Sequence, residues 1–146
     1  MWTNPVSGTV CELLPVLASL SAVREFVAGH AQQAGLAEHE CALLTVAVAE
    51  VFTNIVRHAR GLPADAQVRL SAHCTASTLV LQVQHPGEAF TPPEQPEDTD
   101  FAAFPEGGFG LTIIHKACDR VEYLHHRGIN TVRLHCARPT QQEPAP

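Results

Sequence analysis

Hydrophobic residues recur at helical spacing in two consecutive segments of the chain. In residues 19–35 they repeat every three or four positions, and Gly35 is typical of a helix end. A second helix is predicted for about residues 38–60, where a Gly-Leu-Pro sequence follows. One side of this second helix is apolar and is predicted to face the core. Its members are Leu44, Val48, Val51, Phe52 and Ile55.

Five further segments are predicted to be strands. Two of them alternate between apolar and polar residues and are predicted to form a hairpin around a short polar link. The last two are joined by a predicted turn at residues 127–128. With a short helix at about 110–118, the predicted order is strand, two helices, two strands, helix, two strands. The strand ranges are 8–15, 67–73, 78–85, 120–125 and 130–136.

A long segment without periodicity separates the third strand from the short helix. It is rich in proline and in acidic residues. Loops of this length are usually disordered or functional, so residues 88–106 are predicted to be a lid. Residues 137–146 are predicted to be a flexible tail. The chain, residues 1–146, is therefore expected to be one domain with its core at about residues 8–136.

Composition and charge narrow the functional classes. The 146 residues are 45% hydrophobic and 16% charged, which is typical of a single globular domain. Nine basic residues against fifteen acidic ones give a net charge of −6, which argues against direct binding of nucleic acid. The sequence has neither a basic leader with an apolar core nor an uninterrupted apolar run of roughly 18 residues, so no membrane segment is expected.

The cysteines predict neither a disulfide scaffold nor a zinc site. Their number is odd and no two of them form a CxxC pair. Buried, reduced thiols in a cytoplasmic protein are the expected state. The five residues are Cys11, Cys41, Cys74, Cys118 and Cys136.

A polar stripe runs along the second helix beside its apolar side. Glu50, Asn54 and His58 are four residues apart and therefore lie one above the other. Such a stripe is commonly the solvated face of an amphipathic helix. Two features favour a selected chemical role instead. Asparagine and histidine form helix less readily than lysine or glutamine, and the apolar residues Leu43 and Ala47 flank the stripe. Both interpretations are open on the sequence alone.

Three glycines lie within four residues just before the short helix, in the sequence GGFGL at 107–111. Free N–H groups at the start of a helix bind phosphate, and the alternative is a flexible hinge. Neither usual phosphate motif fits, because the chain has no GxxxxGK followed by Ser or Thr and the spacing is not GxGxxG. A nucleotide bound here would require another fold.

Taken in order, these motifs resemble the Bergerat-type ATPase fold. The motifs are Glu50, Asn54 and His58 on a helix, a strand ending at Gly87 and Phe90, a lid, GGFGL, and a last strand containing Asn-Thr-Val-Arg-Leu. Within that fold the chain is similar to the anti-sigma-factor serine/threonine kinase family, the switch-protein kinase branch of the histidine-kinase-like ATPases. The resemblance covers about residues 8–136. It implies an α+β two-layer sandwich with helices on one face of a mixed, mostly antiparallel sheet.

The resemblance implies ATP and Mg²⁺ as cofactors and assigns roles to residues of this chain. Asn54 would supply its side-chain oxygen to Mg²⁺, a hard ion that prefers oxygen ligands. Glu50 would act as general base toward a substrate hydroxyl or hold a metal-bound water, and His58 would lie near the phosphates or the lid. Thr131 would lie near the adenine. The phosphates would be cradled by Gly107, Gly108, Gly110 and the amide of Leu111.

One residue departs from the family pattern in the nucleotide-binding turn that contains Gly87 and Phe90. The family normally has Asp-x-Gly, so His85 takes the place of the carboxylate that reads the adenine amino group. A neutral imidazole offers one acceptor nitrogen and a protonated imidazole offers none. We therefore expect the adenine contact to be weaker by about 1–3 kcal/mol. Ala89 also stands where a second glycine is sometimes found.

Two functions from different classes follow from the resemblance. The first is a cytoplasmic protein serine/threonine kinase that regulates transcription by partner switching. It would phosphorylate an anti-anti-sigma antagonist and otherwise hold a sigma factor or another regulated protein. The second is a binding module of the same fold with impaired ATP binding, which sequesters its partner by stoichiometry and which His85 favours. A homodimer is compatible with both.

A detached histidine-kinase catalytic domain is a third and weaker interpretation of the resemblance. It is disfavoured because no upstream helix with a phosphoacceptor histidine is found in the sequence.

Overall fold

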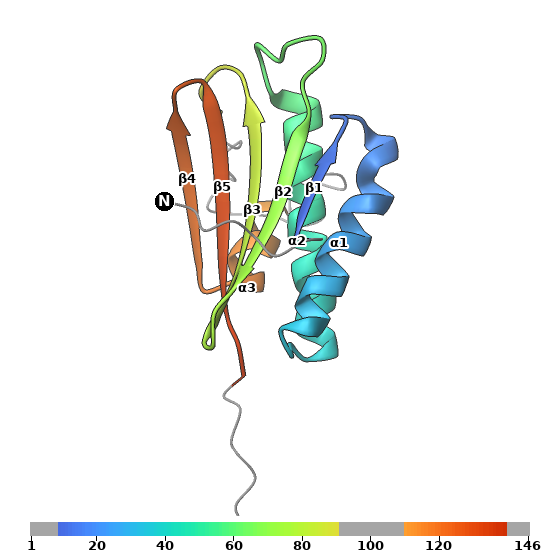
Figure 1. Cartoon of the computed structure of the whole chain (residues 1–146), viewed down its shortest axis with the longest axis vertical. Coiled ribbons are helices and arrows are strands. Elements are labelled where there is room, and N and C mark those ends of the chain that lie inside the picture. The colour runs from blue at the N-terminus through green and yellow to red at the C-terminus, as the bar shows by residue number, and fades with distance from the viewer. Residues whose placement is uncertain (1–8, 91–109, 140–146) are drawn as a thin grey trace, which may run out of the picture.

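The fold is a five-stranded sheet with helices on one face. A computed structural model describes residues 9–90 and 110–139, and Figure 1 shows the helices behind the sheet. The strands are β1 (Val10–Leu13), β2 (Val68–Cys74), β3 (Thr78–Pro86), β4 (Arg120–His126) and β5 (Ile129–Ala137). The helices are α1 (Leu20–Gln33), α2 (Glu38–His58) and α3 (Gly110–Ala117), with a 3-10 turn at Leu17–Ser19 before α1. The predicted α+β sandwich and its order of elements are confirmed.

The strand order is β1-β2-β3-β5-β4, and every strand pair in the described residues is antiparallel. This corrects the expectation of a mixed sheet. The physical reason is that the last two strands form a hairpin, closed by Arg127 and Gly128 at φ of 51° and 76°. The hairpin joins the sheet through β5, which runs opposite to β3, so no parallel pair arises.

α1 ends in a glycine that turns the chain directly into α2. Gly35 has a φ of +85°. Its N–H donates to the Gln32 carbonyl at 3.0 Å, and the Leu36 N–H donates to the Ala31 carbonyl at 3.2 Å. This pair of bonds is the Schellman helix end, which needs a left-handed residue and therefore favours glycine. The turn lets α1 and α2 pack side by side and antiparallel (Figure 1).

α2 buries the side that the sequence predicted to face the core. All five of its predicted core residues are buried, and they join one cluster with the core-facing side chains of the strands, such as Leu70, Leu81 and Leu134. At the start of the helix, Glu40 accepts a hydrogen bond from the Ala37 N–H at 3.0 Å, which satisfies a backbone donor that has no partner within the helix.

Of the described helices, α2 is also the one that is long and apolar enough to cross a membrane by length and composition, with a mean hydropathy of 1.4. The sequence expectation considered uninterrupted apolar runs, whereas an averaged hydropathy tolerates the polar stripe. In this structure the apolar side of α2 packs in the core cluster and α2 contacts α1, which is the situation of a core helix in a globular domain.

Much of the predicted lid and tail lies outside the described residues, because residues 91–109 and 140–146 are not described. Gly107 and Gly108 fall in the first of these ranges. Their predicted role in a phosphate cradle stays a prediction.

Candidate functional site

The polar stripe of α2 lies at the edge of the core. Glu50 and Asn54 are half-buried, and Ala47, one turn before Glu50, is completely buried. Within the described part of the chain, neither polar side chain takes part in a hydrogen bond or ion pair. A half-buried pair beside the buried Ala47 is compatible with the selected role, which stays a prediction. His58, the last residue of α2, is exposed.

The loop after α2 meets the end of β3 at Gly87. The Glu88 N–H donates to the Arg60 carbonyl at 3.0 Å, and the Gly87 N–H donates to the Gly128 carbonyl in the β4–β5 turn, also at 3.0 Å. Gly87 has a φ of +126°, and a Cβ at this position would lie 2.6 Å from the Arg60 oxygen. Three segments that are distant in sequence are therefore held together at one end of the sheet, next to the last turns of α2.

Replacing Gly87 by alanine is expected to lower the free energy of unfolding by about 2 kcal/mol or more, because the new Cβ collides with a backbone oxygen at an unfavourable φ. Urea unfolding with an unchanged slope measures this loss. Gly128→Ala is the matched control, since Gly128 also has a positive φ but no atom within 4 Å of an added Cβ. The control should lose only the backbone cost of about 1 kcal/mol. Equal losses in the two variants would contradict the close approach at Gly87.

His85 lies two residues before Gly87, on the sheet face that the helices cover. It continues the core-facing alternation of Leu81 and Val83 and is 1% exposed. Neither ring nitrogen has a hydrogen-bond partner among the residues that the structure describes. Burial, together with the nearby His125, lowers the pKa of His85 to about 4. The imidazole is therefore neutral at physiological pH, with one donor and one acceptor nitrogen.

The side chains next to His85 already have partners. Phe90 packs against the imidazole in a T-shaped arrangement, with the ring centroids 5.4 Å apart and the ring planes at 84°. Asn130, which pairs with His85 across β3 and β5, accepts a hydrogen bond from the Phe90 N–H at 2.7 Å and donates one to the Glu88 carbonyl at 2.8 Å. Asn130 thus fixes the turn after β3, while both ring nitrogens of His85 lack a hydrogen-bond partner among the described residues.

Sequence reasoning missed two residues of this cluster, Asn130 and His125. Both share the helix-covered face with His85, because they pair with each other across β5 and β4. The Nε2 of His125 lies 3.2 Å from the Gly87 carbonyl oxygen. Counting two positions back from Val132 along the last strand would have identified Asn130 as inward-facing.

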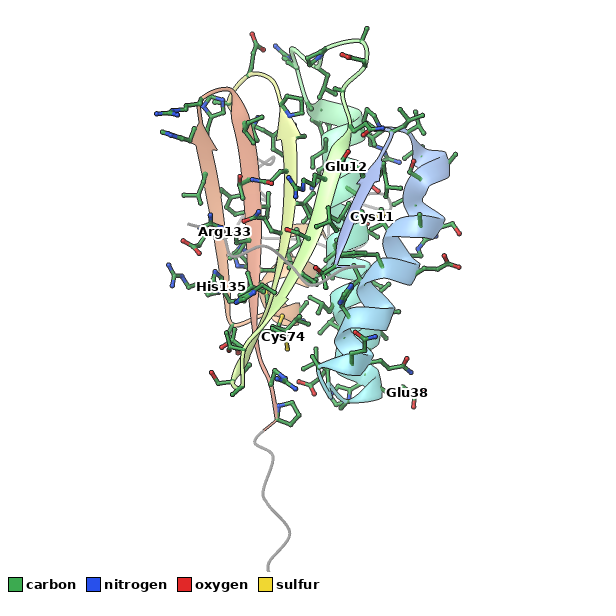
Figure 2. All side chains as sticks on the ribbon, in the orientation of Figure 1. Cys11, Glu12, Glu38, Cys74, Arg133 and His135 are labelled. Carbon is green, nitrogen blue, oxygen red and sulfur yellow. The ribbon has the colours of Figure 1, made fainter. Side chains whose placement is uncertain are left out.

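Thr131 lies on the opposite face of the sheet. It pairs with Gln84, and its hydroxyl accepts a hydrogen bond from the Gln84 side-chain amide at 3.2 Å. Successive side chains of a strand point to opposite faces. The structure therefore does not bring Thr131 together with the other candidate residues. Arg133 and His135, labelled in Figure 2, follow Thr131 on the same face.

The described part of the glycine segment begins at Gly110, the first residue of α3. Gly110 and Leu111 form the first turn of α3, and free N–H groups of such a turn are what a phosphate cradle requires. Ile114 is 1% exposed and anchors α3 in the core, and α3 packs against α2. The start of α3 and the polar stripe of α2 therefore belong to the same layer of the sandwich.

The side chains of the stripe fit Mg²⁺ chemically. Mg²⁺ takes oxygen ligands, usually only one or two of them from protein beside phosphates and water. Asn54 offers a half-buried amide oxygen, and Glu50 offers a carboxylate one turn away. The described ranges contain no cluster of three or more His, Cys, Asp or Glu side chains suited to a metal ion.

An antiparallel sheet with helices on one face agrees with the fold that the sequence motifs predicted. The family model of the histidine kinase-like ATPase domain matches residues 14–136. The chain belongs to this family, and the histidine-kinase-like ATPase family predicted from the sequence motifs is confirmed.

One protein with a similar sequence and one with a similar structure can be compared with this chain. The chain is 28% identical over 115 residues to the serine-protein kinase RsbW of Listeria innocua, a match that covers 73% of this chain and 72% of that protein. A histidine kinase domain from the blue-light activated histidine kinase of Erythrobacter litoralis has a similar structure. Its TM-score is 0.53 at 17% identity, over 90% of this chain and 69% of that chain. The second likeness shows the fold.

Proposed function

We propose that the chain is an ATP- and Mg²⁺-dependent protein serine/threonine kinase that acts as a partner-switching regulator of transcription in the cytoplasm. It phosphorylates an anti-anti-sigma antagonist and otherwise holds a sigma factor or another regulated protein. The observation that carries the proposal is the half-buried pair of Glu50 and Asn54, one turn apart in an ATPase fold. Similarity to a serine-protein kinase supports a protein as the phosphate acceptor.

In the proposed reaction, each residue of the site has a separate task. Asn54 would hold Mg²⁺, which would neutralise charge on the phosphates. Glu50 would take the proton of the substrate hydroxyl while the hydroxyl oxygen bonds to the γ-phosphorus and the bond from that phosphorus to the ADP leaving group breaks. The amides of Gly110 and Leu111 stabilise charge on the phosphates, and His58 contacts the phosphates or the lid. Phosphoryl transfer of this kind depends on positioning and charge stabilisation and needs no covalent enzyme intermediate.

The direct test is phosphoryl transfer from radiolabelled ATP to a panel of small anti-anti-sigma proteins from the same organism. We expect one antagonist to be labelled on serine or threonine, with the label absent when EDTA removes Mg²⁺. A protein that binds MgATP but labels no member of the panel would contradict the kinase assignment.

His85 favours a second function, a binding module of the same fold with impaired ATP binding. The buried imidazole cannot supply the charge-assisted acceptor of a carboxylate. Such a module would hold its partner at a fixed stoichiometry whether or not nucleotide is present. Calorimetric titration with MgATP separates the two functions, because a module of this kind shows no binding at millimolar nucleotide.

A further inference from the structure

At the end of β3, the imidazole of His85 offers both a hydrogen-bond donor and an acceptor. A carboxylate at the same position would offer acceptors only. His85 is 1% exposed, and neither of its ring nitrogens has a partner among the described residues. A neutral imidazole carries one N–H donor and one acceptor nitrogen, and the contact of one nitrogen decides which nitrogen holds the proton. With neither nitrogen committed, the ring can pair with an amino group or with a carbonyl group of a ligand.

None of the described residues next to His85 forms a hydrogen bond that would fix which ring nitrogen carries the proton. Asn130 uses its amide oxygen for the Phe90 N–H and its amide nitrogen for the Glu88 carbonyl. Phe90 packs against the imidazole in a T-shaped arrangement and offers no conventional hydrogen-bonding group to it. His125 lies across Asn130 from His85 in the sheet. None of these groups holds His85 in one tautomer.

We propose that His85 makes this a purine-nucleotide site with little discrimination at ring position 6. The acceptor nitrogen of His85 pairs with the 6-amino group of adenine, and its N–H pairs with the 6-carbonyl group of hypoxanthine or guanine. This inference rests on the proposed nucleotide-binding function. A carboxylate can only accept, so it favours the amino group and repels the carbonyl oxygen. A site whose polar group can only accept discriminates strongly against a nucleotide that has no donor at that position. A site whose polar group can either donate or accept discriminates far less.

Titration calorimetry of the full chain with MgATP and with MgITP isolates this contact. The two nucleotides share the triphosphate and the ribose, and their rings differ only at position 6 and in the hydrogen on N1. We expect their dissociation constants to lie within about threefold of each other. In His85→Asp, ATP should bind at least about tenfold more tightly than ITP, because the carboxylate accepts only from the amine.

His85→Asn is the matched control, since its amide also carries one donor group and one acceptor and turns over to suit the ligand. It should keep the near-equal affinities of the parent. If His85→Asp does not fold, as judged by circular dichroism, the parent and His85→Asn decide the question without it.

The outcomes separate this inference from the function on which it rests. A parent chain that binds ATP more than about tenfold more tightly than ITP would overturn the relaxed selectivity and leave the ATP-dependent function in place. A parent chain that binds neither nucleotide at millimolar concentration would overturn both.

Discussion

Replacing Asn54 by alanine is expected to weaken MgATP binding by about 100-fold or more, which corresponds to about 2.7 kcal/mol. The physical reason is that alanine removes the side-chain oxygen proposed for Mg²⁺ without adding charge. Asn54 lies outside the buried core cluster, so the fold should survive the change. Calorimetric titration with Mg²⁺ and again with EDTA measures the effect, and in the variant the two affinities should become nearly equal.

Thr53 offers a matched control on the same turn of α2. Its hydroxyl donates to the Ala49 carbonyl at 2.8 Å within the helix, and it has no proposed contact with nucleotide. Thr53→Ala should therefore keep the MgATP affinity of the parent within about threefold. If Asn54→Ala also kept the parent affinity, Asn54 would have no place in the metal site.

A glutamine in place of Glu50 is expected to slow phosphoryl transfer by about 100-fold or more while ATP affinity stays within about threefold of the parent. Glutamine keeps the shape and the hydrogen-bonding capacity of the side chain but cannot accept the proton of the substrate hydroxyl. Single-turnover transfer to the antagonist that the parent phosphorylates measures the rate, and calorimetry measures the affinity.

Glu12→Gln makes the same chemical change on β1, at an exposed residue labelled in Figure 2. This control should transfer phosphate at the parent rate. A full rate in Glu50→Gln would show that Glu50 is not the general base. A parallel loss of rate and affinity in that variant would assign Glu50 to nucleotide binding instead.

The fold could be predicted from the sequence because its signals are local. The helical period of α2 places Leu44, Phe52 and Ile55 on one side, and all three are buried. Gly35 marks the end of α1 because only a left-handed residue closes that helix with both of its final bonds. Period-two alternation likewise located β2 and β3, apart from the continuation of β3 through Pro86.

The contacts around His85 and Gly87 at the end of β3 could not be predicted in the same way, because they depend on strand register and on how loops meet the sheet. Alternation back from Val132 tells which face of the sheet Asn130 is on, but it does not tell which residue of the neighbouring strand lies beside it. The pairing of β5 with β3 places Asn130 beside His85. The approach of Gly87 to the Arg60 carbonyl depends on how the loop after α2 meets the sheet. The low pKa of His85 depends on how completely the ring is buried and on the nearby His125, and both follow from the packing of distant segments.

The pairing of β3 with β5 also governs the order in which this protein becomes functional during synthesis. α1 with α2, and β2 with β3, are contacts between neighbouring elements that form early, whereas β3 receives β5 only after α3 and β4 have been made. Until then β3 is an edge strand whose apolar residues Leu81 and Val83 lack their neighbours on β5, a state prone to aggregation. Asn130 belongs to β5 as well. Its hydrogen bonds to Phe90 and Glu88, which fix the turn beside His85, therefore cannot form before β5 has been synthesised. The fixed turn beside His85 and the protection of the edge of β3 therefore both depend on the pairing of β3 with β5.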